Sequence, residues 1–203
     1  YRFKRVEELM NQNPKLNIEN VAAILRDQKG LNDQNIGMGN EKAVNQLIAH
    51  HSVIFKPEEL KVWVSTSPFQ LGKYICYDLN KVFSNAENMK NYQDIYEENL
   101  SIAADSFLYS NEYTNFNRFK EIRSQIQASI KTNQQIVEED KVLDEMIHCN
   151  PEFFETYVYI GDYFKHFNIT DKAFLAYTKA LKKEIPNIYQ RESIEEKIKE
   201  LNN

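Results

Sequence analysis

The sequence HHSVIFKPEELKVWVSTSPFQLGKYICYDLNKVF, residues 50–83, is the stretch densest in β-strand signals in a chain that is otherwise mostly helical in its periodicity. Val53 and Phe55 alternate with Ile54, and a second alternating run follows the KPEEL turn, as in adjacent antiparallel strands. A third strand is expected at residues 74–77. The sequence therefore predicts a small antiparallel sheet within an α+β fold.

Both faces of this predicted sheet carry large apolar side chains. One face carries Ile54 and Trp63, and the opposite face carries Val53, Phe55, Val62 and Val64. An isolated sheet of two or three strands cannot bury both of its faces. We therefore expect partner strands that are not part of this chain.

The residues before the sheet predict two helices and a loop. Apolar residues at helical spacing indicate a first helix over residues 2–10, with the stripe Phe3, Val6, Leu9 and Met10. Asn17 can cap a second helix, whose expected buried stripe is Ile18, Val21, Ala22 and Leu25. Because the chain begins with Tyr1, we expect that an upstream portion, with any targeting signal, is missing from it.

Gly37 and Gly39 lie in the loop LNDQNIGMGN, residues 31–40. Their spacing suggests a phosphate-binding loop, but Lys42 replaces the third glycine of that motif and no strand precedes the loop. The favoured interpretation is that both glycines adopt positive φ in a long loop that borders a site.

Six short runs carry a resemblance to a known family. They are Asn45-Gln46, residues 50–55, Leu60, residues 63–66, residues 72–74 and residues 77–79. Together they resemble the C-terminal part of the autoproteolytic cysteine acyltransferases and amide hydrolases related to isopenicillin-N acyltransferase and, more distantly, to choloylglycine hydrolase. The resemblance covers about the first 85 residues.

The resemblance implies an αββα sandwich of the N-terminal-nucleophile type. In that family an internal Gly-Cys bond is cleaved, and the freed cysteine attacks an amide or thioester carbonyl. The chain would then be the C-terminal portion of an enzyme that acts on the C–N bond of a small N-acyl substrate, without a cofactor. Its first partner would be the upstream portion of the same protein, which supplies the missing strands and the nucleophile.

The two cysteines do not fit the nucleophile of that family. Neither Cys76 nor Cys149 follows a glycine, and the expected role of both is that of small buried apolar residues. The candidate supporting residues are Asn45, as a donor to a developing oxyanion, and His51 or His50, as a group that orients a neighbour.

Beyond residue 83 the apolar period changes to that of a helix. Helices are predicted over residues 94–109, along the stripe from Phe116 to Ile130, and through residues 142–147. Residues 151–186 resemble a single tetratricopeptide repeat, in which Gly161 allows close helix contact, and a capping helix follows. The expected ranges are 1–85 for the hydrolase-like part, 86–150 for a helical linker region and 151–203 for the tetratricopeptide-like hairpin with its capping helix.

Composition excludes several classes of function. The net charge is −5, and the 25 basic residues are scattered, which argues against a nucleic-acid partner. No apolar run approaches the length of a membrane span, and no His/Cys spacing is typical of a zinc site. Two alternatives stay open: a homo-oligomer, and a non-enzymatic helical protein-interaction module whose short sheet only anchors the helices.

Overall fold

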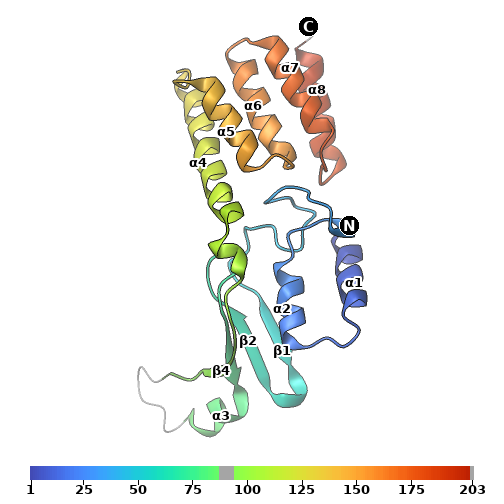
Figure 1. Ribbon diagram of the computed structural model, residues 1–203, viewed down its shortest axis with the longest axis vertical. Helices are drawn as coiled ribbons and strands as arrows, with labels where there is room; N and C mark the ends of the chain where they lie inside the picture. The colour runs from blue at the N-terminus through green and yellow to red at the C-terminus, as the bar shows by residue number, and fades with distance from the viewer. Residues whose placement is uncertain (87–93, 202–203) are drawn as a thin grey trace. The chain divides into compact units, whose positions relative to one another are not determined.

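The computed structural model describes residues 1–86 and 94–201, and its fold class is α+β, as predicted. The described residues form eight α-helices and a four-stranded antiparallel sheet (Figure 1). Two compact units result. Unit 1 comprises Tyr1–Asn32 and Val44–Leu108, and unit 2 comprises Asp33–Ala43 with the remaining C-terminal residues. These units differ from the three expected ranges, because Asp33–Ala43 folds with the C-terminal helices.

Unit 1 contains the sheet, with strand order β1-β2-β3-β4. Its elements are α1 (Arg2–Gln12), α2 (Ile18–Arg26), β1 (Val53–Lys56), β2 (Lys61–Ser65), β3 (Tyr74–Asp78), α3 (Leu79–Ser84) and β4 (Glu97–Ile102). The short 3₁₀ turn Pro57–Glu59 joins β1 to β2, and further 3₁₀ turns lie at Leu31–Asp33 and Ser106–Tyr109. The first three strands are those that the sequence predicts.

Helix α2 covers one face of the sheet. The cross-strand row Ile54, Trp63 and Cys76 is buried together with Ala22 of α2. Asn17 caps the helix as predicted, because its side chain accepts a hydrogen bond from the Asn20 N–H at 2.7 Å. A local capping signal thus marks the start of α2, and its apolar stripe is the side of the helix that packs on the sheet.

The prediction of a helix over residues 94–109 is wrong. Strand β4 lies mostly in the first half of that range and pairs with β3, with Ile102 opposite Tyr74. The Trp63 indole N–H donates to the Leu100 carbonyl at 2.8 Å, and both Leu100 and Ile102 pack on the sheet core. The spacing of Leu100 and Ile102 also fits the two-residue repeat of a strand. Pairing with the free edge of β3 therefore favours a strand here, although the apolar spacing also fits a helix.

The apolar stripe of α1 is only partly covered. Phe3 is 74% exposed and Met10 is 44% exposed, whereas the buried residue of this helix is Arg5. Arg5 forms two hydrogen bonds with the Asp27 carboxylate, Nε to Oδ2 at 3.0 Å and Nη2 to Oδ1 at 2.8 Å. An ion pair therefore attaches α1 to the end of α2.

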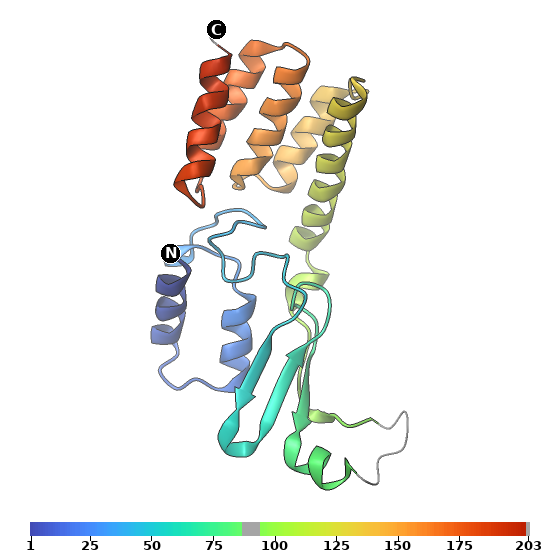
Figure 2. The ribbon, with the colours of Figure 1, turned by 180° about the vertical axis from the view of Figure 1, so that it is seen from behind.

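Unit 2 is an array of helices, seen from behind in Figure 2. Its elements are α4 (Asn111–Thr132), α5 (Glu139–Cys149), α6 (Phe154–His166), α7 (Thr170–Leu181) and α8 (Ile188–Glu200). The stripe predicted from Phe116 onward is buried in α4 at Phe116, Phe119, Ile122 and Ile126. A Cβ at Gly161 of α6 would lie 2.4 Å from the Tyr177 ring of α7, so this glycine allows the close contact that the sequence predicts.

The segment Asp33–Ala43 is held against these helices by hydrogen bonds and an ion pair, in which side chains of both the segment and the helical region take part. Asn150 accepts a hydrogen bond from the Met38 N–H at 3.0 Å and donates to the Met38 carbonyl at 2.9 Å. Asn40 donates to the Glu184 carbonyl at 2.9 Å, and Lys42 pairs with the Glu184 carboxylate. Gly37 and Gly39 have φ of +84° and +91°, as the sequence interpretation expects.

Candidate functional site

Polar side chains of unit 1 gather where α2 ends beside the turn between β2 and β3. Asn45 is 1% exposed and connects two segments there. Its main-chain N–H donates to the Asp27 carbonyl at 2.8 Å, and its side-chain amide donates to the Phe69 carbonyl at 3.1 Å. The Asn45 Oδ1 accepts from the Leu47 N–H at 2.9 Å. The structure thus gives Asn45 a loop-fixing role, and its role as an oxyanion donor stays a prediction.

The two histidines before β1 are both exposed. His50 and His51 precede Ser52, whose hydroxyl is hydrogen-bonded to the Tyr74 hydroxyl. The structure therefore places a hydroxyl pair, and no histidine, at this buried end of the sheet. The orienting role of His51 stays a prediction.

Arg26 is the buried charge at this end of the sheet, and sequence reasoning did not single it out. Its Nη2 donates to the carbonyls of Gly72 at 2.7 Å and of Ala103 at 3.0 Å, and its guanidinium lies 4.9 Å from the centre of the Tyr74 ring. Burial lowers the pKa of Arg26, and Asp105, 4.0 Å from its Nε, opposes this effect. The sequence feature that could have indicated burial of Arg26 is its spacing: it lies about one helical turn after Ala22, on the side of α2 that is buried.

This arrangement fixes the backbone around the end of the sheet. The carbonyls of residues 72 and 103 come from different segments, and one cationic side chain satisfies both of them. Within residues 1–86 and 94–201, the Nε of Arg26 has no hydrogen-bond partner. Arg26 therefore holds in place the segments that carry Gly72 and Ala103.

Neither cysteine has the properties of a nucleophile. Both are buried, and burial raises the pKa of the Cys76 thiol and of the Cys149 thiol. A raised pKa lowers the fraction of thiolate, which is the reactive form. Neither thiol is therefore expected to act as a nucleophile in the folded chain.

Alkylation kinetics test this description of the cysteines. We expect iodoacetamide at pH 8 to modify Cys76 and Cys149 of the folded chain at least about tenfold more slowly than in 6 M guanidinium chloride, because a thiol below its pKa is mostly protonated. Mass spectrometry of the two tryptic peptides gives the separate rates. A cysteine that reacts in the folded chain as fast as a free thiol would contradict the structural role.

The sheet face opposite α2 is apolar and uncovered, and we name it the open sheet face. It consists of two cross-strand rows: Val53, Val64 and Ile75 in one, and Phe55, Val62 and Tyr77 in the other. None of these side chains is fully buried: Phe55 and Val53 are exposed, by 67% and 36%, and the other four are half-buried. The sequence placed large apolar residues on both faces, and this chain buries one of those faces itself.

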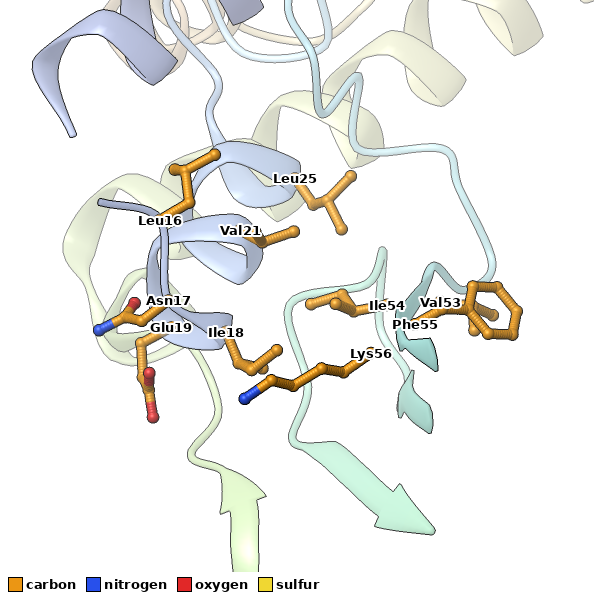
Figure 3. A pocket seen from close by; sticks show the side chains of 10 residues that line it. All are labelled: Leu16, Asn17, Ile18, Glu19, Val21, Leu25, Val53, Ile54, Phe55 and Lys56. Atoms are coloured by element: carbon orange, nitrogen blue, oxygen red, sulfur yellow. The ribbon is translucent and has the colours of Figure 1, made fainter. Parts of the chain in front are cut away.

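An open groove of about 720 Å³ lies between α2 and β1 (Figure 3). Figure 3 shows Val21 and Leu25 of α2 turned toward Ile54 of β1, while Phe55 points away to the open sheet face. The other apolar residues that line the groove are Leu16, Ile18, Val53 and Phe55. The sequence did not reveal this groove, because only the sheet order shows that β1 is an edge strand.

Groups that could hold a metal ion are absent from the described part of the chain, where no three His, Cys, Asp or Glu side chains converge. No described helix is both long enough and apolar enough to cross a membrane.

Comparisons with known proteins give no further assignment. No protein-family model, no curated protein and no solved structure matches this chain.

Proposed function

We propose that unit 1 is one helix and sheet layer of an αββα sandwich, and that the chain is the C-terminal portion of an N-terminal-nucleophile amide hydrolase or acyltransferase. Its substrate is a small N-acyl compound: a cysteine supplied by a polypeptide upstream of this chain attacks the acyl carbonyl carbon, and the C–N bond breaks to release the amine. The observation that supports the proposal is that α2 covers one face of the sheet, whereas the opposite face is apolar and open.

The open sheet face supports a second sheet as its cover. Its six apolar side chains form two rows across three strands, which is the surface that face-to-face sheets bury between them. At about 25 cal/mol per Å² of apolar surface, covering these rows contributes several kcal/mol to assembly. The polar residues Asn45 and Ser52 would then lie at the rim of the sandwich.

The test is to express the chain together with the polypeptide encoded upstream of Tyr1. We expect self-cleavage before a cysteine, detected by mass spectrometry, and release of amine from a panel of N-acyl amides, detected with fluorescamine. Replacement of that cysteine by alanine should abolish both. Absence of a cleaved cysteine would overturn the enzymatic proposal.

A matched pair of variants tests the contribution of this chain. Val64→Lys places a charge in the middle of the open sheet face and should prevent self-cleavage, because the lysine ammonium cannot be buried between two sheets without a partner. Tyr189→Lys is the control, because Tyr189 is 79% exposed on α8. Equal self-cleavage in both variants would contradict the proposed cover.

A second function is proposed for unit 2: a non-enzymatic module that binds a polypeptide segment in a turn conformation. The two hydrogen bonds that the Asn150 side chain exchanges with the Met38 main chain support it, because an amide side chain can both donate to and accept from the main chain of one residue. The bound residues form a turn, in which the Asn40 N–H donates to the Gly37 carbonyl. In the folded chain the bound polypeptide is the segment Asp33–Ala43.

The test replaces residues 33–43 by a Gly-Ser linker of equal length and adds the peptide DQNIGMGNEKA, which has the sequence of the replaced segment. We expect the peptide to bind in fluorescence anisotropy and Asn150→Ala to weaken it about tenfold, because two hydrogen bonds of about 0.5–1.5 kcal/mol each are lost. A folded linker variant that does not bind the peptide would overturn this function.

A further inference from the structure

The outer edge of β1 carries unpaired main-chain groups. The Ser65 N–H donates to the Ser52 carbonyl at 3.0 Å, which makes residues 52 and 65 a hydrogen-bonded pair. Because such pairs alternate along an antiparallel ladder, Ile54 pairs with Trp63 in the same way, and the main-chain groups of Val53 and Phe55 point away from β2. Within residues 1–86 and 94–201, no strand pairs with this edge.

The next pair of strands confirms this alternation. The Thr66 N–H donates to the Lys73 carbonyl at 2.8 Å, so the even-numbered residues of β2 bond to β3 and the odd-numbered residues bond to β1. The outer edge of β1 therefore offers two N–H donors and two carbonyl acceptors. Their spacing is that of every second residue in an extended strand.

Apolar surfaces flank this edge on both sides. A strand added beside β1 would turn alternate side chains into the groove, toward Ile18, Val21 and Ile54. Its other side chains would extend the rows that begin at Val53 and Phe55 on the open sheet face. Of the described residues that line the groove, two are charged, the acidic Glu19 and the basic Lys56, so their charges cancel. Lys56 also forms an ion pair with Glu59.

We propose that the outer edge of β1 and the adjoining groove bind an added β-strand from another polypeptide, an extended segment that is apolar on both of its faces and carries no net charge where it contacts the groove. Main-chain hydrogen bonds to Val53 and Phe55 fix the register of the added strand, and apolar contacts in the groove favour apolar side chains on it. The proposal goes beyond catalysis, because strand addition requires no nucleophile.

A second copy of β1 fits the groove less well than such a segment. In an antiparallel pairing of two copies, the side chains turned into the groove would be those of Ser52, Ile54 and Lys56. Two of these three are polar, whereas the groove is lined largely by apolar side chains and has a volume of about 720 Å³. The occupant we expect therefore carries an apolar residue at each of these positions.

Two variants of one residue separate main-chain pairing from side-chain contact. Phe55→Ala and Phe55→Pro both remove the aromatic ring, but only proline removes the outward N–H. Proline is tolerated at an edge-strand position whose N–H faces solvent, so the ladder with β2 is retained. Circular dichroism of both variants checks that retention.

The binding probe is a fluorescein-labelled peptide, KKVIVIKK, and the control probe is the same peptide with its four central amides N-methylated. We expect the first peptide to bind the complete chain in fluorescence anisotropy, and N-methylation to weaken binding at least about tenfold. Phe55→Pro should bind the unmethylated peptide at least about fivefold more weakly than Phe55→Ala, because one main-chain hydrogen bond is lost.

Amide hydrogen exchange supplies a residue-level measurement on the unmodified chain. Without peptide, the N–H groups of Val53 and Phe55 should exchange much faster than that of Ile54, and the peptide should slow the two fast ones about tenfold or more. Equal binding of the N-methylated peptide, or unchanged exchange at Val53 and Phe55, would overturn the proposal. Self-association that Phe55→Pro abolishes would overturn it in favour of a second copy.

Discussion

Replacement of Gly37 by alanine is expected to lower the free energy of unfolding of unit 2 by about 3 kcal/mol. Gly37 has φ of +84°, and a Cβ there would lie 2.3 Å from the Phe153 nitrogen and 2.4 Å from the Phe153 Cα. Positive φ costs an alanine about 1–2 kcal/mol, and overpacking adds about 1–3 kcal/mol. Because the colliding atoms belong to the backbone, no rotamer change relieves the contact.

Gly39→Ala is the matched control for this prediction. Its φ of +91° is similar, but its Cβ would meet side-chain atoms of Phe116 and Phe153 at the ordinary distances of 3.6 and 3.9 Å. We expect a loss of about 1–2 kcal/mol, from backbone conformation alone. Urea unfolding followed by far-ultraviolet circular dichroism measures both variants. Equal losses would show that Gly37 is not in close contact with Phe153.

The second large effect is expected at Arg5. Arg5→Met should lower the free energy of unfolding of unit 1 by about 3 kcal/mol, because methionine fills the space of the stem but leaves the Asp27 carboxylate without its guanidinium partner. The Arg5 side chain is 1% exposed and that of Asp27 is 11% exposed, so water replaces little of the lost interaction.

Lys4→Met is the control, because Lys4 lies on the exposed side of the same helix. A surface change of this kind should alter the free energy of unfolding by less than about 0.5 kcal/mol. The double variant Arg5→Met/Asp27→Asn should recover part of the loss, because the unpaired charge is removed as well. If Arg5→Met behaves like Lys4→Met in urea unfolding, the ion pair does not hold α1 on unit 1.

The two proposals for unit 1 concern neighbouring surfaces of one sheet. The open sheet face would be covered by a second sheet, and the outer edge of β1 would receive a further strand of the same sheet. Both surfaces are apolar on a chain whose net charge is −5, and both would be liabilities for aggregation if they stayed exposed. The self-cleavage experiment and the peptide experiment can fail separately, so each proposal is tested alone.

Several features of the candidate site could be predicted from the sequence. The alternation around Ile54 and Trp63 gave the strands and their faces, because successive side chains of a strand point to opposite sides. Asn17 marked the start of α2, and the spacing from Phe116 to Ile126 marked the buried side of α4. These signals are local, since each depends on residues within two turns or one strand.

Other features depended on contacts between distant residues. Residues 97–102 form a strand because the edge of β3 was free to pair with them, although their spacing also fits a helix. Arg5 is buried because Asp27, 22 positions away, receives its guanidinium, and no pattern within α1 indicates that partner.

The sequence by itself determined many elements of this protein: the helices before the sheet, the buried stripe of α4, the first three strands, and apolar residues on both sheet faces. The tertiary structure alone decided which face α2 covers, that β1 is an edge strand beside a groove, and that Asp33–Ala43 folds with the C-terminal helices. The physical reason is that periodicity and capping depend on residues close together in the chain. Strand order, ion pairs and side-chain hydrogen bonds to the main chain instead join residues far apart in the chain.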